Sequence, residues 1–311
     1  MTPKSVVDFS VQYDILILDS YHSNERMLFV IDLKDFHDEL LDILLEFDRI
    51  CRKHNINYSL AYGTLLGAIR HNGFIPWDDD VDIMMERNEF DKFCSICSSE
   101  LDECFFFQSK QTEKLYPYNI CRIRKNNTAM IYEEWKKAGI HLGIYIDIYP
   151  VDRIPDNKFL KKLQTLAIIL MTPIRISRNP VVYKTGAKKF NQALKNLIYI
   201  FTKIAPKKLC DKIEHYFLTF CKNKPCQKNG IICEGGTLIN PPKDMIPFSV
   251  DFMNEYTEVN FENHKLMCVA NPEQLLEHWY GNYMELPPKE KQIMFHQPEI
   301  FDTKNSYEKY I

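Results

Sequence analysis

The chain has 311 residues, a formal net charge of −3 and 45% hydrophobic residues. A chain of this length buries a full core and holds one large domain, or one domain with an insertion. The near-neutral charge argues against general affinity for nucleic acid, so we expect no nucleic-acid partner. No apolar run reaches the length that spans a bilayer, and residues 1–10 lack the basic-then-apolar layout of a signal peptide.

Ten cysteines are scattered along the chain without a regular framework. This distribution is typical of reduced thiols, so we expect a cytoplasmic protein. Cys94 and Cys97 have a spacing that occurs in metal sites. They fall inside a helical pattern, however, with no second pair at the distance that a zinc site needs.

Outside residues 58–86, the first third of the chain contains two predicted helices and a strand. Residues 1–30 carry little pattern, and we treat them as an N-terminal arm. From Leu33 to about His54, apolar residues recur at the spacing of an amphipathic helix that packs on a core. A second helix is predicted from Glu86 to about Ser99, followed by a short buried strand at 105–107.

Residues 58–86 hold the densest set of chemically informative side chains. The apolar start, 58–62, predicts a buried strand, which turns at Gly63 and Thr64 into a helix. The first N–H groups of a helix have no partner inside it, and they attract anions. We therefore predict that Gly63 and Thr64 bind phosphate.

An acidic run, 78–82, leads into a second strand. Residues two apart in a strand share a face, so Asp80 and Asp82 project together while Val81 points into the core. Adjacent carboxylates repel each other unless a cation neutralises them or one takes a proton. Oxygen ligands beside a phosphate site suit Mg²⁺ or Mn²⁺, so we predict a metal site here. The alternative is a solvated acidic loop.

Two stretches, 119–124 and 128–133, alternate well enough to be paired strands across an Asn-rich turn. Arg122 and Arg124 then share one face of the first strand. They form either a basic pair that faces solvent or a clamp on donor phosphates, for which the planar guanidinium group is suited.

A further strand is predicted at 144–150, with three isoleucines on one side and Tyr145, Asp147 and Tyr149 on the other. A carboxylate in such a run is costly to bury unless it meets a cation or a proton donor. We therefore expect Asp147 to be the third carboxylate of the metal site, as a metal ligand, as a general base or as both. The alternative is a buried aspartate that caps a turn.

Residues 157–228 are strongly basic, with 14 lysines and two arginines against Asp211 and Glu214. Apolar residues recur at helical spacing around 159–170, 194–204 and 213–220, which predicts a helical subdomain. Basic amphipathic helices are either solvated faces over a core or surfaces that lie on anionic lipid. We favour contact with a membrane face or with a polyanionic glycan.

The last part of the chain, 229–311, returns to mixed composition. Strands are predicted at Tyr256–Phe261 and at 265–269, and a helix at Pro272–Tyr280. His296 either contacts phosphate or is an ordinary surface histidine.

Three of these stretches resemble the LicD family, which is related to fukutin and belongs to the nucleotidyltransferase-fold superfamily. The first is GTLLG at 63–67 with Arg70 and His71, followed by GFIPWDDDVD at 73–82. The second is the strand that ends IDIYP at 146–150, and the third is YGNYMELPP at 280–288 with His296 beyond it. The resemblance covers 33–152 well and 256–296 moderately.

The resemblance implies an α+β fold, with a nucleotidyltransferase-type mixed sheet flanked by helices and a basic helical insertion. On this basis we divide the chain into the arm (1–30), a catalytic core (31–156), the basic helical subdomain (157–228) and a C-terminal part (229–311) that completes the catalytic domain. With the patterns above, it assigns Asp80, Asp82 and Asp147 to catalysis and metal binding. The residues assigned to donor binding are Gly63, Thr64, Arg70, Arg122, Arg124 and His296.

LicD-like proteins are regarded as transferases that move phosphocholine from CDP-choline to a sugar of a cell-surface glycan, and the fukutin-related branch moves ribitol phosphate from CDP-ribitol. The resemblance therefore implies a metal-dependent transferase that uses CDP-choline or a related CDP-linked donor. Its acceptor would be a lipopolysaccharide, teichoic acid or capsule precursor at the cytoplasmic face of the membrane. Alternatives are transfer of phosphoethanolamine, a phosphonate or a polyol phosphate, nucleotidyl transfer, and a non-catalytic nucleotide-binding scaffold.

Aromatic residues near the predicted centre either form a box for the quaternary ammonium group of choline or simply pack in the core. They are Tyr62, Trp77, Tyr116, Tyr118, Trp135, Tyr145 and Tyr149.

Overall fold

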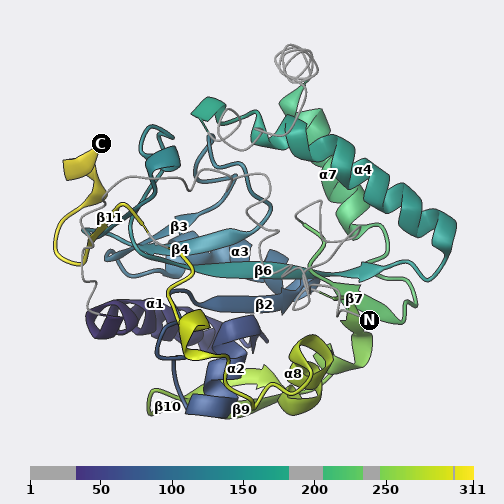
Figure 1. The fold of residues 1–311 in the computed structure, drawn as a ribbon. Helices are drawn as coiled ribbons and strands as arrows, with labels where there is room; N and C mark the ends of the chain where they lie inside the picture. The colour runs from purple at the N-terminus through teal and green to yellow at the C-terminus, as the bar shows by residue number, and fades with distance from the viewer. Residues whose placement is uncertain (1–32, 182–205, 234–245, 297) are drawn as a thin grey trace, which may run out of the picture.

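The structure, a computed structural model, describes residues 33–181, 206–233, 246–296 and 298–311 (Figure 1). The predicted N-terminal arm and the predicted helix at 194–204 lie outside these residues. Within them, helices and a mixed sheet form an α+β fold, which confirms the predicted fold class. No described helix has the length and apolar character needed to cross a membrane.

Seven strands form the central sheet. They are β1 (Ser59–Leu60), β2 (Asp82–Glu86), β3 (Phe105–Gln108), β4 (Cys121–Lys125), β6 (Tyr145–Ile154), β7 (Lys228–Gly230) and β8 (Phe248–Ser249). The main path has the order β1-β2-β6-β4-β3, and β7 pairs with both β6 and β8. β2 and β6 are parallel, whereas every other pair in this sheet is antiparallel.

One face of the sheet is apolar and is covered by two helices, α1 (Leu33–Lys53) and α3 (Arg87–Glu100). Both helices pack on β6 and on each other (Figure 1). Cys94 of α3 contacts Cys121 of β4, whose register partner on β6 is Ile148. The isoleucine side of β6 therefore faces the core, as the alternation predicted, and its other side is left for polar residues.

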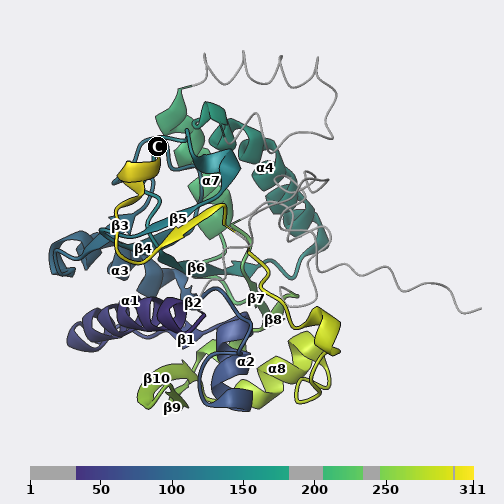
Figure 2. The same ribbon diagram turned by 60° about the vertical axis from the view of Figure 1, so that its left-hand side comes forward.

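A second group of elements lies below the sheet in both ribbon views (Figures 1 and 2). It contains α2 (Tyr62–His71), α8 (Pro272–Tyr280) and the hairpin of β9 (Tyr256–Phe261) with β10 (His264–Val269). α2 packs against α8 and β9, and β10 packs against β1. This contact brings the C-terminal part of the chain to the loop that carries the acidic run.

The predicted hairpin of 119–124 with 128–133 is wrong. β4 is already paired on both edges, with β3 and with β6, so its backbone has no edge left for a third strand. The following strand, β5 (Ala129–Ile131), pairs instead with β11 (Ile300–Asp302) near the C-terminus (Figure 2). Short 3-10 helices complete the described elements: η2 (Glu133–Trp135), η4 (Val250–Met253), η5 (Lys289–Lys291) and η6 (Tyr307–Tyr310).

The basic segment contributes two described helices, α4 (Lys158–Ile176) and α7 (Lys207–Thr219), which pack against each other at one side of the molecule (Figure 1). They confirm the helices predicted around 159–170 and 213–220. The predicted domain boundaries at 156 and 228 stay a prediction.

Candidate active site

A row of polar side chains crosses the face of the sheet opposite α1 and α3. The register places Gln108 beside Arg122, Arg122 beside Asp147, and Asp147 beside Asp82. Register partners on neighbouring strands point to the same face, so the carboxylates of Asp82 and Asp147 are neighbours. The backbone N–H of Asp147 also donates to the carbonyl of Val81 at 2.9 Å. Two acidic stretches that are far apart in the sequence therefore meet on one sheet face.

Arg122 binds Asp147 through two hydrogen bonds. Its Nε donates to Oδ1 at 2.5 Å, and its Nη2 donates to Oδ2 at 3.3 Å. Burial acts to lower the pKa of Arg122, but the charges of Asp147, Tyr145 and Tyr116 and the hydrogen bond to Asp147 together outweigh burial and hold that pKa well above its ordinary value. The pair is buried, so the alternative of a solvent-facing arginine is wrong for Arg122.

Three aromatic rings surround the Arg122 guanidinium. Its carbon lies 4.1 Å from the ring centre of Tyr145, 5.6 Å from that of Trp135 and 5.7 Å from that of Tyr118. Tyr118 and Trp135 are stacked on each other at 5.5 Å. These faces, for which a choline box was one of two alternatives, thus already hold a cation that belongs to the protein.

Tyr62 and Tyr149 lie outside this group of rings. They contact each other edge to face with ring centres 6.0 Å apart, and Tyr62 also contacts Trp279. Tyr116 is fully buried behind Tyr118, with ring centres 5.4 Å apart, in the apolar cluster that contains Trp135. The seven aromatic residues therefore do not converge on one box.

Arg124 has a structural position instead of the phosphate contact that we predicted. Arg124 is only 1% exposed. Its Nε donates to Gln108 Oε1 at 2.5 Å, and its Nη1 donates to the carbonyl of Gly143 at 2.6 Å. Burial, together with the charge of Arg122, lowers its pKa to about 10. These hydrogen bonds hold Arg124 between two parts of the domain.

The N-terminus of α2 lies next to the acidic run, as expected. The Asp78 carboxylate packs against Gly63, where a Cβ atom would lie 2.6 Å from Asp78 Oδ2. The hydroxyl of Thr64 accepts a hydrogen bond from the Asp82 N–H at 2.9 Å, which ties α2 to the start of β2. A phosphate that reaches Gly63 must therefore share the helix end with Asp78.

Asp79 and His296 form a contact that the sequence patterns did not reveal. The backbone N–H of His296 donates to Asp79 Oδ2 at 2.6 Å. The ring Nδ1 of His296 lies 3.3 Å from Asp79 Oδ1 and 3.5 Å from Asp80 Oδ2. No local pattern links positions 79 and 296, and the one available signal was the family hallmark that precedes His296.

The donor set at this face fits a divalent cation. Burial raises the pKa of Asp78 well above its ordinary value, and the charges of Asp80 and Asp79 add to this shift, which indicates a local excess of negative charge. Asp79, Asp80 and His296 each offer a ligand atom within 4.8 Å of the others. Asp82 and Asp147 add two carboxylates on adjacent strands. Oxygen-rich sites of this kind suit Mg²⁺ or Mn²⁺.

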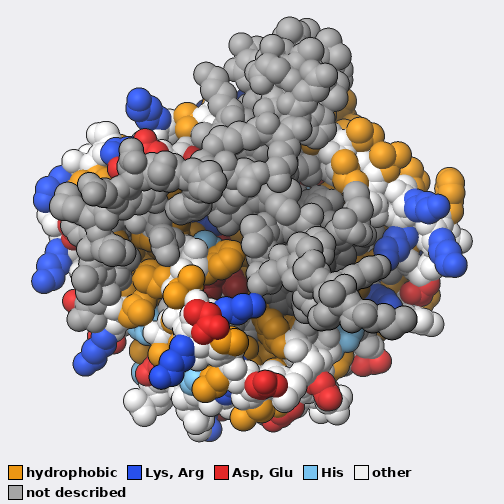
Figure 3. All heavy atoms as spheres, in the orientation of Figure 1, with side chains coloured by type: hydrophobic (Ala, Val, Ile, Leu, Met, Phe, Trp, Pro, Cys, Tyr) orange, Lys and Arg blue, Asp and Glu red, His pale blue; other side chains and the backbone are white. Residues whose placement is uncertain are grey.

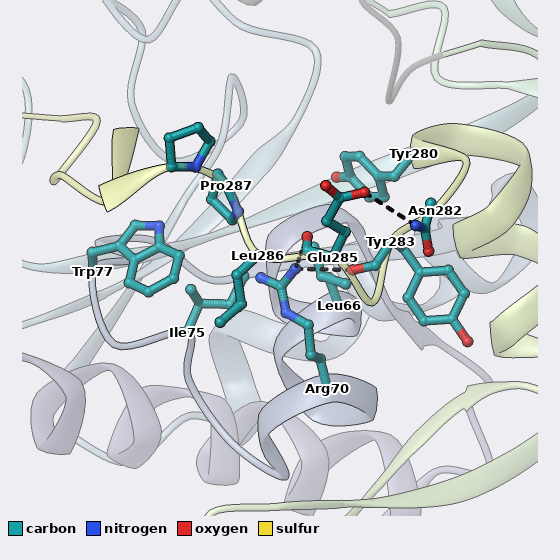
Figure 4. Close-up of a pocket in the computed structure, with 11 residues that line it drawn as sticks. Leu66, Arg70, Ile75, Trp77, Tyr280, Asn282, Tyr283, Glu285, Leu286 and Pro287 are labelled. Carbon is teal, nitrogen blue, oxygen red and sulfur yellow. Dashed lines mark hydrogen bonds between the residues drawn. The ribbon is translucent and has the colours of Figure 1, made fainter. Parts of the chain in front are cut away.

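A pocket of about 480 Å³ adjoins the acidic run and holds Arg70 (Figure 4). Arg70 lies in the last turn of α2, so it does not join Gly63 and Thr64 in the first turn. Its Nη1 donates to the carbonyl of Tyr283 at 2.9 Å. Trp77 and Ile75 line one side of the pocket, and the C-terminal residues line the other: Tyr280, Asn282, Tyr283, Glu285, Leu286, Pro287 and Pro288. The pocket is therefore lined by residues of two of the stretches that resemble the LicD family, 63–82 and 280–288.

The mixed sheet, the acidic row on its open face and the helix that begins beside it define an α+β domain suited to binding a charged ligand. Residues 55–165 match the family model described as the LicD/FKTN/FKRP nucleotidyltransferase domain. This match confirms the resemblance over residues 55–165.

Three curated proteins show the extent of the similarity. Lipopolysaccharide cholinephosphotransferase LicD of Haemophilus influenzae is 27% identical over 275 residues, which are 84% of this chain and 94% of that protein. An uncharacterized protein of Rickettsia typhi is 48% identical over 129 residues, 40% of this chain and 38% of that protein. An uncharacterized protein of Rickettsia prowazekii is 30% identical over 121 residues, 39% of this chain and 41% of that protein.

Proposed function

We propose that the protein is a metal-dependent transferase that moves a phosphocholine-type group from a CDP-linked donor to a sugar hydroxyl of a cell-surface glycan. The activity named for the Haemophilus relative, which aligns over most of both chains, supports the group transferred and the lipopolysaccharide acceptor. The observation that carries the proposal is the register of β2 with β6, which sets Asp82 beside Asp147 at the acidic run.

We assign the divalent cation to Asp80, Asp82 and Asp147. A bound Mg²⁺ or Mn²⁺ would neutralise charge on the donor diphosphate and on the departing CMP. Arg122 fixes the Asp147 carboxylate by binding both of its oxygens.

The remaining groups would position the donor. Asp79 holds His296 beside the carboxylates, where the imidazole would contact a phosphate oxygen. In the reaction, an acceptor hydroxyl gives up its proton to solvent, its oxygen forms a bond with the phosphorus that bears choline, and the bond from that phosphorus to the oxygen of CMP breaks. The pocket around Arg70 and Trp77 adjoins this centre and offers aromatic faces and a carboxylate, Glu285, to an organic part of a substrate.

Release of CMP from a panel of CDP-linked donors tests the proposal. The purified protein would be incubated with Mn²⁺ or Mg²⁺, a glycan acceptor, and CDP-choline, CDP-ethanolamine or CDP-ribitol. We expect CMP release that depends on the acceptor and stops with EDTA. Nucleotidyl transfer would instead release phosphocholine and leave CMP on the acceptor. No turnover with any donor, together with no metal-dependent donor binding in calorimetry, would refute the proposal.

A matched pair of substitutions tests the site. Asp82→Asn keeps the shape of the side chain but removes its charge. We expect turnover to fall by at least about a hundredfold, which exceeds the typical loss of activity when a residue that only orients a metal ligand is replaced. Asp35→Asn makes the same change at an exposed position in the first turn of α1 and should leave turnover unchanged. Equal activity of the two variants would remove Asp82 from the site.

A further inference from the structure

Helix α4 has its apolar side on the outside. Four large hydrophobic residues are exposed: Phe159 (73%), Leu163 (40%), Leu166 (54%) and Leu170 (55%). Its buried residues are Gln164, Ile168, Thr172 and Arg175, of which three are polar. At about 100° per residue, the four exposed positions fall within roughly 60° of one another, on the side opposite the buried set. A helix that covers a core in water has the reverse arrangement.

Buried polar contacts fix this orientation. Arg175 Nε donates to Glu214 Oε1 of α7 at 2.9 Å, and Gln164 Nε2 donates to the carbonyl of Phe217 at 3.1 Å. A rotation that buried the leucines would break the buried Arg175–Glu214 ion pair and the hydrogen bond from Arg175 to the carbonyl of Pro117, which is strongly unfavourable. The outward apolar stripe is therefore a stable feature of the fold, and each of its side chains forgoes the stabilisation of burial.

The same helix carries only positive charge on its exposed surface. Between Lys158 and Ile176 the sequence has no aspartate or glutamate. Lys158, Lys161 and Lys162 line a hollow of about 450 Å³ whose other lining residues, Thr165, Leu166 and Ile169, reach the stripe. Figure 3 shows hydrophobic side chains along this edge of the molecule, with lysine and arginine side chains beside them.

We propose that the exposed face of α4 docks on an anionic lipid bilayer. The apolar stripe would enter the boundary between headgroups and acyl chains, and the lysines would bind lipid phosphates. Charge complementarity selects this occupant, because a cationic hollow next to an apolar stripe matches the layered charge of an anionic membrane surface. The proposal rests on α4 alone and does not depend on the transfer reaction.

Sedimentation of the full chain with vesicles tests the docking face. We expect the wild type to bind vesicles that contain phosphatidylglycerol and not vesicles of phosphatidylcholine alone. The variant Lys158→Gln, Lys161→Gln, Lys162→Gln should bind about a hundredfold more weakly, because each lysine near an anionic surface contributes about a fivefold factor. The variant Leu163→Gln, Leu166→Gln, Leu170→Gln should lose binding to a similar extent. Ile293→Ser, which removes an aliphatic side chain exposed to 62% on the C-terminal segment, is the matched control.

The outcomes separate the possible occupants of the face. The replaced leucines are exposed, so circular dichroism and the melting temperature should match the wild type and show that the variants fold. No binding to anionic vesicles, or equal binding by the leucine variant, overturns the proposal. A wild-type dimer that the leucine substitutions dissociate also overturns it, because a second copy would then cover the face. CMP release with a water-soluble acceptor should be unaffected, so a failure here is distinct from a failure of the proposed transfer.

Discussion

The Arg122–Asp147 pair gives the sharpest test of the site. In Arg122→Met the guanidinium disappears, and the buried Asp147 carboxylate loses both of its hydrogen bonds. Removing one partner of a buried ion pair costs about 3–5 kcal/mol, because the other charge stays buried without compensation. For a chain of this size, such a loss lowers the melting temperature by about 6–12 °C. We expect this shift in thermal and urea unfolding.

The reasoning also predicts how the loss is relieved. Asp147→Asn in the Arg122→Met background removes the unpaired charge, so the double variant should be more stable than the single one. A double-mutant cycle should return a coupling energy of at least about 2 kcal/mol. If Asp147 is a metal ligand, Mn²⁺ should also raise the melting temperature of Arg122→Met more than that of the wild type. A single variant within 1 kcal/mol of the wild type, or a cycle without coupling, would show that the pair is not energetically significant.

Three further predictions concern packing, pH and the C-terminal segment. Gly67→Ala would place a Cβ 2.5 Å from the Gly73 carbonyl oxygen, so urea unfolding should show a loss of about 1–3 kcal/mol; a gain, as at an open helix position, would contradict the packing. Burial and the charge of Arg124 lower the pKa of His141 to about 3. The unfolded chain therefore binds a proton below about pH 6.5 that the folded protein does not, and stability should fall by up to about 1.4 kcal/mol per pH unit from there towards pH 3. His141→Asn should remove this contribution, and an unchanged pH slope would exclude it. Asp79→Asn weakens the anchor of His296, so limited proteolysis should cleave the segment after Pro288 faster; equal rates would mean that the contact does not hold the segment.

Elements with strong local periodicity were predicted well. The apolar spacing after Leu33 corresponds to α1, Leu33–Lys53, and the helix predicted at Pro272–Tyr280 has the same bounds as α8. Tyr256–Phe261 likewise forms β9. In these segments the residues that share a face lie three, four or two positions apart, so local spacing contains the information that the backbone uses.

Pairings between distant strands were harder to predict. Adjacent alternating stretches suggested a hairpin, but β4 is held by β3 and β6, and β5 pairs with β11. Likewise Arg122 and Arg124 share a strand face, yet they have different partners, Asp147 for the first and Gln108 with Gly143 for the second. Alternation shows which side chains point the same way, but the partner strand decides what they meet.

The sequence by itself determined the local geometry of the site: Asp80 and Asp82 two apart at the start of a strand, Gly63 at the start of a helix, and a lone Asp147 in an apolar strand. Only the tertiary structure placed Asp147 beside Asp82, brought His296 to Asp79 and turned the apolar side of α4 outward. The physical reason is common to all three. Helical and strand periods specify which residues share a side, whereas the direction of that side depends on packing between segments that the chain brings together from far apart.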